Sequence, residues 1–157
     1  MNILHTSVLD TFKSVCFWSP FLAWMIAQFT KMLCGFSRTH RLDFSYIVSV
    51  GGMPSAHSAM VSGLATSIGM TVGFDSVVFD VALAFALLVM FDAATVRRAA
   101  GTQARLLNEM VDELFKEHRL SEKKLAELLG HTRLEVGMGM VMGILVALIV
   151  TSVPLLR

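Results

Sequence analysis

Two short polar stretches contain histidines that can take part in nucleophilic or acid–base chemistry. In LGHTRLEV, residues 129 to 136, His131 and Glu135 are four residues apart, a spacing that places both on one face of a helix. A carboxylate that accepts a hydrogen bond from one imidazole nitrogen fixes the tautomer and makes the other nitrogen more nucleophilic. With a second histidine as proton donor, phosphoryl transfer becomes feasible without a metal. The structural alternative is that Glu135 pairs with Arg133 or caps the following helix.

The second histidine lies in GGMPSAHS, residues 51 to 58. Pro54 indicates the first position of a helix. The backbone N–H that proline lacks would have no partner inside the helix at that position. The N–H groups of Ser55, Ala56 and His57 would then face outward, where they favour an anion, and the two glycines allow a ligand close to the backbone. The alternative is a plain helix start with an incidental histidine.

Cations near these stretches indicate which anion the site would take. Lys31, Arg97 and Arg98 lie near the ends of apolar segments, and Asp92 precedes the two arginines closely enough to hold one of them in place. Phosphate is the obvious anion at a lipid surface. A metal site made of His57, Asp92, His131 and Glu135 is disfavoured because the neighbouring cations would repel a divalent ion. We therefore predict no metal and no other cofactor.

The elements that must position these residues are apolar blocks. The chain has 157 residues, of which 55% are apolar and 16% charged, and its mean hydropathy is +0.67. Four blocks are near the length that crosses a hydrocarbon core of about 30 Å, and they cover residues 18–34, 55–72, 77–96 and 136–156. The pattern predicts an all-α fold, a polytopic membrane helical bundle of about four spans.

The remaining sequence is predicted to belong to the same single membrane-embedded domain, residues 1–157. Residues 101–130 form a soluble insertion before the last span, with the pattern of a short amphipathic helical hairpin whose second arm starts at Ser121 and ends at Gly130. In the last block, Gly139 and Gly143 have the GxxxG spacing that permits close helix packing in lipid. Cys16 and Cys34 lie too far apart along one helix to form a disulfide.

The four-span arrangement brings all the polar groups to one membrane face. Lys31 ends the first span, Ser55 and His57 begin the second, Asp92 ends the third, and His131 with Glu135 begins the fourth. The segments 35–54 and 97–135 lie on that side and contain ten of the basic residues between Lys31 and the last span, whereas the other side has only Lys13 and Arg157. By the positive-inside rule, the site of this integral, multi-pass protein faces the cytoplasm and both termini face outward.

Six segments together resemble the divergent branch of the type 2 phosphatidic acid phosphatase superfamily, which is related to acid phosphatases and vanadium-dependent haloperoxidases. They appear in family order within residues 27–145, and they read AQFTK, RLDFS, GGMPSAHSA, FDAATVRRAAGTQA, LLN and ELLGHTRLEV. The resemblance implies a helical membrane phosphatase in which His131 attacks phosphorus and Glu135 orients it, where the wider superfamily has an aspartate. His57 would be the general acid.

The resemblance also implies a phosphate-binding set. Ser55 with its neighbouring N–H groups would contact the phosphate oxygens, and Lys31 would neutralise their charge. Spacing from Lys31 in the wider superfamily selects Arg38, whereas the divergent branch selects Arg41, so both stay open. The superfamily's Ser-Arg before the nucleophile would fall at Lys124-Leu125, where the arginine is missing, and Arg97 or Arg98 can replace it.

The predicted function is hydrolysis of a lipid phosphate, or of a related phosphate ester or pyrophosphate, through a phosphohistidine. The alternative is a phospholipid-binding or lipid-translocating protein that uses the same anion pocket without catalysis. The expected partners are a phosphorylated lipid substrate and membrane lipids, and no nucleic acid. The sequence leaves open whether the bundle forms homo-oligomers.

Overall fold

The architecture is helical. A computed structural model describes residues 8–39, 52–114 and 131–153, and these ranges contain helices and no strand. The elements in chain order are the short 3₁₀ helix η1 (Val8–Lys13), α1 (Val15–Thr39), α2 (Ala56–Val72), α3 (Val77–Ala94), α4 (Val96–Leu114) and α5 (Arg133–Ser152). The all-α prediction is confirmed, and α1, α2, α3 and α5 correspond to the four predicted blocks.

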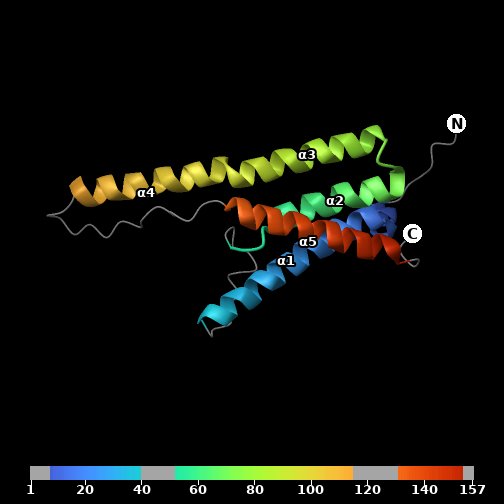
Figure 1. The fold of residues 1–157 in the computed structure, drawn as a ribbon, viewed down its shortest axis with the longest axis horizontal. Coiled ribbons are helices and arrows are strands. Elements are labelled where there is room, and N and C mark those ends of the chain that lie inside the picture. Colours follow the sequence, from blue (N-terminus) through green and yellow to red (C-terminus); the bar gives the residue numbers. More distant parts are fainter. Residues whose placement is uncertain (1–7, 40–51, 115–130, 154–157) are drawn as a thin grey trace.

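Helix α2 lies at the centre of the bundle and contacts α1, α3 and α5 (Figure 1). Its buried positions are small, because three neighbouring helices must approach its backbone. Ser58, Ser62 and Ser67 are buried, and the Ser62 hydroxyl donates to the carbonyl oxygens of Ser58 at 2.6 Å and of Met140 in α5 at 3.1 Å. The Ser62 hydroxyl is therefore satisfied by helix carbonyls inside the bundle.

The closest packing joins α2 to α5 through two glycines. A Cβ atom added to Gly139 would overlap the Ser55 carbonyl oxygen, and one added to Gly143 would overlap the Ala59 carbonyl oxygen. Backbone atoms cannot move aside as a flexible side chain can, so both positions require glycine. The GxxxG prediction for α5 is confirmed.

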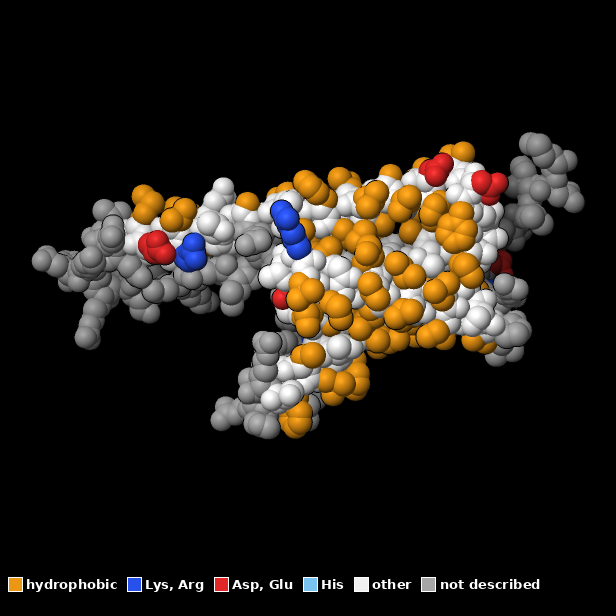
Figure 2. Space-filling model, viewed as in Figure 1, with side chains coloured by type: hydrophobic (Ala, Val, Ile, Leu, Met, Phe, Trp, Pro, Cys, Tyr) orange, Lys and Arg blue, Asp and Glu red, His pale blue; other side chains and the backbone are white. Residues whose placement is uncertain are grey.

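Large apolar side chains cover the outside of the bundle. On α3, Val77, Val81, Leu88 and Phe91 are all more than 60% exposed. Figure 2 shows apolar side chains spread over the face formed by α3 and its neighbours, with charged groups near the ends of the bundle. Apolar surface outside with small hydroxyl and methyl groups inside is the arrangement expected of helices in lipid.

Two of the described helical stretches are long and apolar enough to cross a membrane by themselves. They are Val77–Val111, which runs through α3 into α4, and Arg133–Ser152, which is α5. Helix α2 is shorter and rich in serine and threonine, because its sides face other helices. Helix α1 contains the polar residues Gln28 and Lys31, which are buried inside the bundle.

Three predicted helix boundaries were wrong. Helix α1 begins at Val15, one turn before the expected start, because the Ser14 hydroxyl accepts from the Cys16 N–H at 3.2 Å; Pro20 thus lies inside the helix. It also continues to Thr39, so Lys31 lies two turns before its end. Helix α2 begins at Ala56 with Ser55 as N-cap, so Pro54 precedes the helix.

The predicted insertion begins without a break from α3. Thr95 interrupts the helical geometry, yet its N–H donates to the Phe91 carbonyl at 3.0 Å and its carbonyl accepts from the Ala99 N–H at 2.9 Å. The two helices therefore form one extended rod that leaves the bundle (Figure 1). The first arm of the predicted hairpin is helical as expected, whereas the second arm lies outside the described residues.

The α2–α5 contact generates a prediction about stability. Gly143→Ala places a methyl group against the Ala59 carbonyl, and we expect it to lower the free energy of unfolding by about 1–3 kcal/mol. Gly137→Ala is the matched control in the same helix, since an added Cβ there meets nothing within 4 Å. The control should be neutral or stabilise by about 0.5–1 kcal/mol. Unfolding in detergent measures both, and equal effects would show that the packing inferred for Gly143 is wrong.

Candidate functional site

The first turn of α5 is fixed by a reciprocal pair of hydrogen bonds. Thr132 is the N-cap, its hydroxyl accepts from the Glu135 N–H at 3.3 Å, and the Glu135 carboxylate accepts from the Thr132 N–H at 2.9 Å. This capping box satisfies two N–H groups that have no partner within the helix. Glu135 therefore caps the last helix, as the structural alternative predicted.

The same carboxylate also contacts His131. Nδ1 of His131 lies 3.2 Å from Oε2 of Glu135, and the imidazole is buried, with 1% of the residue exposed. His131 precedes the helix, so the contact does not arise from the helix-face spacing that predicted it. It arises because the capping box draws the glutamate side chain back over the N-terminus of α5. A glutamate suits both partners, since its length lets it reach back to them.

The main chain of α2 is bonded directly to this turn. The Ser55 N–H donates to the Glu135 carbonyl at 3.0 Å, so the prediction that this N–H faces a ligand was wrong. The Ser55 hydroxyl is buried and accepts from the Ser58 N–H at 3.4 Å and from the Ser58 hydroxyl at 3.0 Å. Ser55 thus caps α2 and fastens its start to α5.

The end of α3 holds the residue before the turn. The His131 N–H donates to the Ala93 carbonyl at 3.1 Å, and Ala93 is itself buried. Asp92, the neighbouring residue, is half-buried in the last turn of α3. Main-chain hydrogen bonds from α2 and α3 therefore meet at residues 131–135.

Lys31 approaches the same place from α1. Only 3% of this residue is exposed, and it lies within electrostatic reach of Glu135. Both side chains line a cavity of about 250 Å³ between α1, the residues before α2 and the start of α5. The lining residues are Lys31, Cys34, Gly35, Gly52, Met53, Thr132, Leu134 and Glu135. His131 does not line the cavity, but it contacts Glu135, which does.

The other predicted site residues lie on α2, on α4 and at the end of α1. His57 lies in the first turn of α2 and is half-buried. It precedes by one turn Val61, which packs against Ala82 and Ala86, so His57 is on the α3 side of α2. Arg97 and Arg98 fall in the first turn of α4, and Arg38 in the last turn of α1, but their side chains are outside what the structure describes. Arg41 lies outside the described residues.

Two groups at the site were not singled out from the sequence. Thr132 is the partner of Glu135 in the capping box, and the pattern Thr-x-x-Glu before an apolar run is a readable signal for it. The Ala93 carbonyl carries no side-chain chemistry, and no sequence pattern identifies it as the acceptor for His131.

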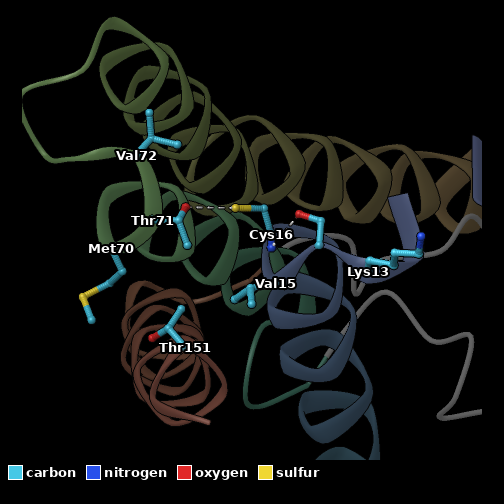
Figure 3. A pocket seen from close by; sticks show the side chains of 8 residues that line it. Lys13, Val15, Cys16, Met70, Thr71, Val72 and Thr151 are labelled. Atoms are coloured by element: carbon cyan, nitrogen blue, oxygen red, sulfur yellow. Dashed lines mark hydrogen bonds between the residues drawn. The ribbon is translucent and has the colours of Figure 1, made fainter. Parts of the chain in front are cut away.

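A larger cavity of about 520 Å³ lies at the other end of the bundle (Figure 3). It is lined by the start of α1 and the ends of α2 and α5, and the Cys16 sulfur lies 3.4 Å from the Thr71 hydroxyl in its wall. None of the predicted site residues lines it. Cys16 and Cys34 are both free and line opposite cavities, so the expectation that they do not pair is confirmed. Among the described residues, no three His, Cys, Asp or Glu side chains are grouped so as to hold a metal ion.

Comparison with known proteins identifies relatives of this chain. The model of the Divergent PAP2 family matches residues 12–146. A Bacillus subtilis (strain 168) protein described as "Uncharacterized membrane protein YuiD" is 39% identical over 142 residues, which cover 83% of this chain and 90% of that protein. No solved structure matches. The family match covers the helices that build the site, so this membrane protein belongs to the Divergent PAP2 family.

Proposed function

We propose that the protein is a membrane phosphatase that hydrolyses a lipid phosphate, or a related phosphate ester or pyrophosphate, through a phosphohistidine. The observation that supports this most is the 3.2 Å contact between Nδ1 of the buried His131 and the Glu135 carboxylate. It keeps one proton on Nδ1 and leaves Nε2 as the nucleophile. The adjoining cavity with Lys31 is the place for the phosphate.

In the first step, Nε2 of His131 attacks phosphorus and the bond from phosphorus to the ester oxygen breaks. The departing oxygen carries the electron pair of that bond, and His57 gives it a proton. Glu135 stabilises the positive charge that develops on the imidazole, as the carboxylate of a catalytic triad does. The product is phosphohistidine and a free alcohol, or a shorter phosphate in the case of a pyrophosphate.

In the second step, water attacks phosphorus and the phosphorus–nitrogen bond breaks. His57, now without its proton, accepts one from the water, and the bonding electrons return to Nε2. Inorganic phosphate leaves and both histidines are restored. No oxidant, reductant or additional group is needed for this balance.

Cations and N–H groups stabilise the charge on the phosphate oxygens during both steps. In this proposal Lys31, Arg38 or Arg41, and Arg97 or Arg98 supply the cations, and Asp92 holds one arginine in place. The Ser55 N–H is bonded to the Glu135 carbonyl, so in this proposal Ser55 acts through its hydroxyl, beside the Ala56 N–H at the start of α2.

The resting site is closed around the imidazole. Glu135 lines the cavity, whereas His131 is almost fully buried. A phosphate in the cavity therefore meets Glu135 before it meets Nε2, and attack requires the residues between them to shift. Leu134 is an exposed lining residue of the same turn, whereas Thr132 is held by the capping box.

The proposal places the site at the cytoplasmic face of a multi-pass bundle, with the exposed apolar side chains of α3 and α5 in contact with membrane lipids. The phosphorylated substrate would reach the cavity from the lipid surface. The same pocket without turnover would make the protein a phospholipid-binding or lipid-translocating protein, and the experiments below separate these functions.

The catalytic proposal predicts loss of turnover when the nucleophile is removed. In detergent with a metal chelator, the purified protein should release phosphate from lipid monophosphates or pyrophosphates and be inhibited by vanadate. His131→Ala should lower kcat at least about a thousandfold and abolish an acid-labile phosphoprotein intermediate. Cys16→Ala changes a residue at the other cavity and should retain wild-type turnover, so it controls for expression and purification of a variant protein. Full turnover by His131→Ala would refute the mechanism, and lipid binding without phosphate release would indicate the non-catalytic function.

The double role of Glu135 predicts a separation of stability from activity. Glu135→Gln retains an oxygen that accepts from the Thr132 N–H, so thermal unfolding should stay close to wild type. Its amide cannot carry the negative charge that His131 needs, and kcat should fall by about 100-fold to 10,000-fold. Glu135→Ala should lose the same activity and also about 1 kcal/mol of helix capping. An active Glu135→Gln enzyme would show that the carboxylate only caps α5.

The orientation is tested by labelling introduced cysteines. In a Cys16→Ser, Cys34→Ser background, His118→Cys should react with a membrane-impermeant maleimide only after the cells are lysed, because it lies within the basic segment 97–135 that is predicted to be cytoplasmic. Asp75→Cys, in the exposed turn between α2 and α3, is the matched position on the opposite side and should react in intact cells. The reverse pattern would place the site on the outer face.

A further inference from the structure

Lys31 is a buried cation whose position suggests a role beyond contact with phosphate. A lysine near the end of a helix in lipid ordinarily extends its ammonium group to water. Here 3% of the residue is exposed, and it lies two turns before the end of α1. Because removing an ammonium group from water costs several kcal/mol, a nearby anion must compensate for it.

Burial is the larger effect on the Lys31 ammonium group, and the Glu135 carboxylate is an anion that offsets part of it. It lines the same cavity as Lys31 and acts on it electrostatically. Its hydrogen bonds to the Thr132 N–H and to His131 Nδ1 both end on Oε2, and 20% of its side chain is exposed. Both bonds therefore use the same carboxylate oxygen, on a side chain that also lines the cavity with Lys31.

We propose that Lys31 is a positioning residue that acts through Glu135: its positive charge keeps a single proton, on Nδ1, in the His131–Glu135 pair. A second proton on this pair would add positive charge beside a buried ammonium group, which low-dielectric surroundings make unfavourable. Nε2 therefore stays unprotonated and able to attack. The inference rests on the proposed function for its catalytic meaning, but the protonation of His131 can be measured without turnover.

Other charged groups around the pair act in both directions. His57 on α2 adds positive charge if it is protonated, Asp92 on α3 adds negative charge beside Ala93, and Arg133 on α5 is exposed to solvent. Lys31 differs from these because it is both buried and in the cavity that Glu135 lines. Its removal should therefore alter the pair more than removal of Arg133.

The test is a comparison of the imidazole ¹⁵N spectra of histidine-labelled protein in lipid nanodiscs at neutral pH without substrate. The His131 signals are assigned by their loss in His131→Asn. In wild type, Nε2 should resonate as an unprotonated ring nitrogen. In Lys31→Met it should move to the range of a protonated nitrogen, and in Lys31→Arg, which retains the charge, it should remain as in wild type. Arg133→Met is the matched control for loss of an exposed cation and should also resemble wild type.

Activity supplies the second measurement. If Lys31 acts through Glu135, Lys31→Met lowers kcat at least about tenfold and Lys31→Arg restores it; if it only binds phosphate, KM rises and the spectrum without substrate stays unchanged. Methionine has a similar volume and is tolerated at buried ion positions, so the fold should persist. An unprotonated Nε2 in Lys31→Met overturns the inference. A wild-type protein that hydrolyses none of the phosphates refutes the proposed function instead, and the spectra still decide the role of Lys31.

Discussion

The close contact between α2 and α5 is the constraint on which the rest of the structure depends. Gly139 and Gly143 let the two backbones approach until only glycine fits, and the Ser55 N–H then reaches the Glu135 carbonyl. This bond joins the start of one helix to the start of the other, so their N-terminal ends lie at the same level. A residue with a side chain in place of either glycine would push the two helices apart and separate the two polar turns of the candidate site.

The composition of the bundle follows from the solvent around it. In a soluble domain large apolar side chains fill the interior, but here they cover the outside of α3 and α5, and alanine, glycine and serine occupy the centre. Small residues permit dense helix packing where lipid supplies no hydrophobic drive between helices. Buried hydroxyls then need acceptors, and the Met140 carbonyl provides one for Ser62. In the part of the chain that the structure describes, the buried Lys31 and His131 both lie toward the end of the bundle where α5 begins.

Glu135 joins the helix cap and the buried histidine through one side chain. Its carboxylate completes the capping box with Thr132 and contacts Nδ1 of His131 through the same oxygen. Stability of the helix start and orientation of the imidazole are thus coupled, because movement of the carboxylate disturbs both. The glutamate side chain is long enough for its carboxylate to reach back over the start of its own helix.

The sequence by itself determined the helices and the chemistry available to them. Block length and apolar content predicted four helices, since these depend on the local composition of the chain. The pairing of His131 with Glu135 and the close packing at Gly139 and Gly143 were also readable, because each depends on residues near one another in the chain. Only the tertiary structure decided that Ser55 uses its N–H on Glu135, that the Ala93 carbonyl holds His131, and that Lys31 is buried beside Glu135. These contacts join residues far apart in the chain through main-chain atoms or through burial, and local patterns carry no information about either.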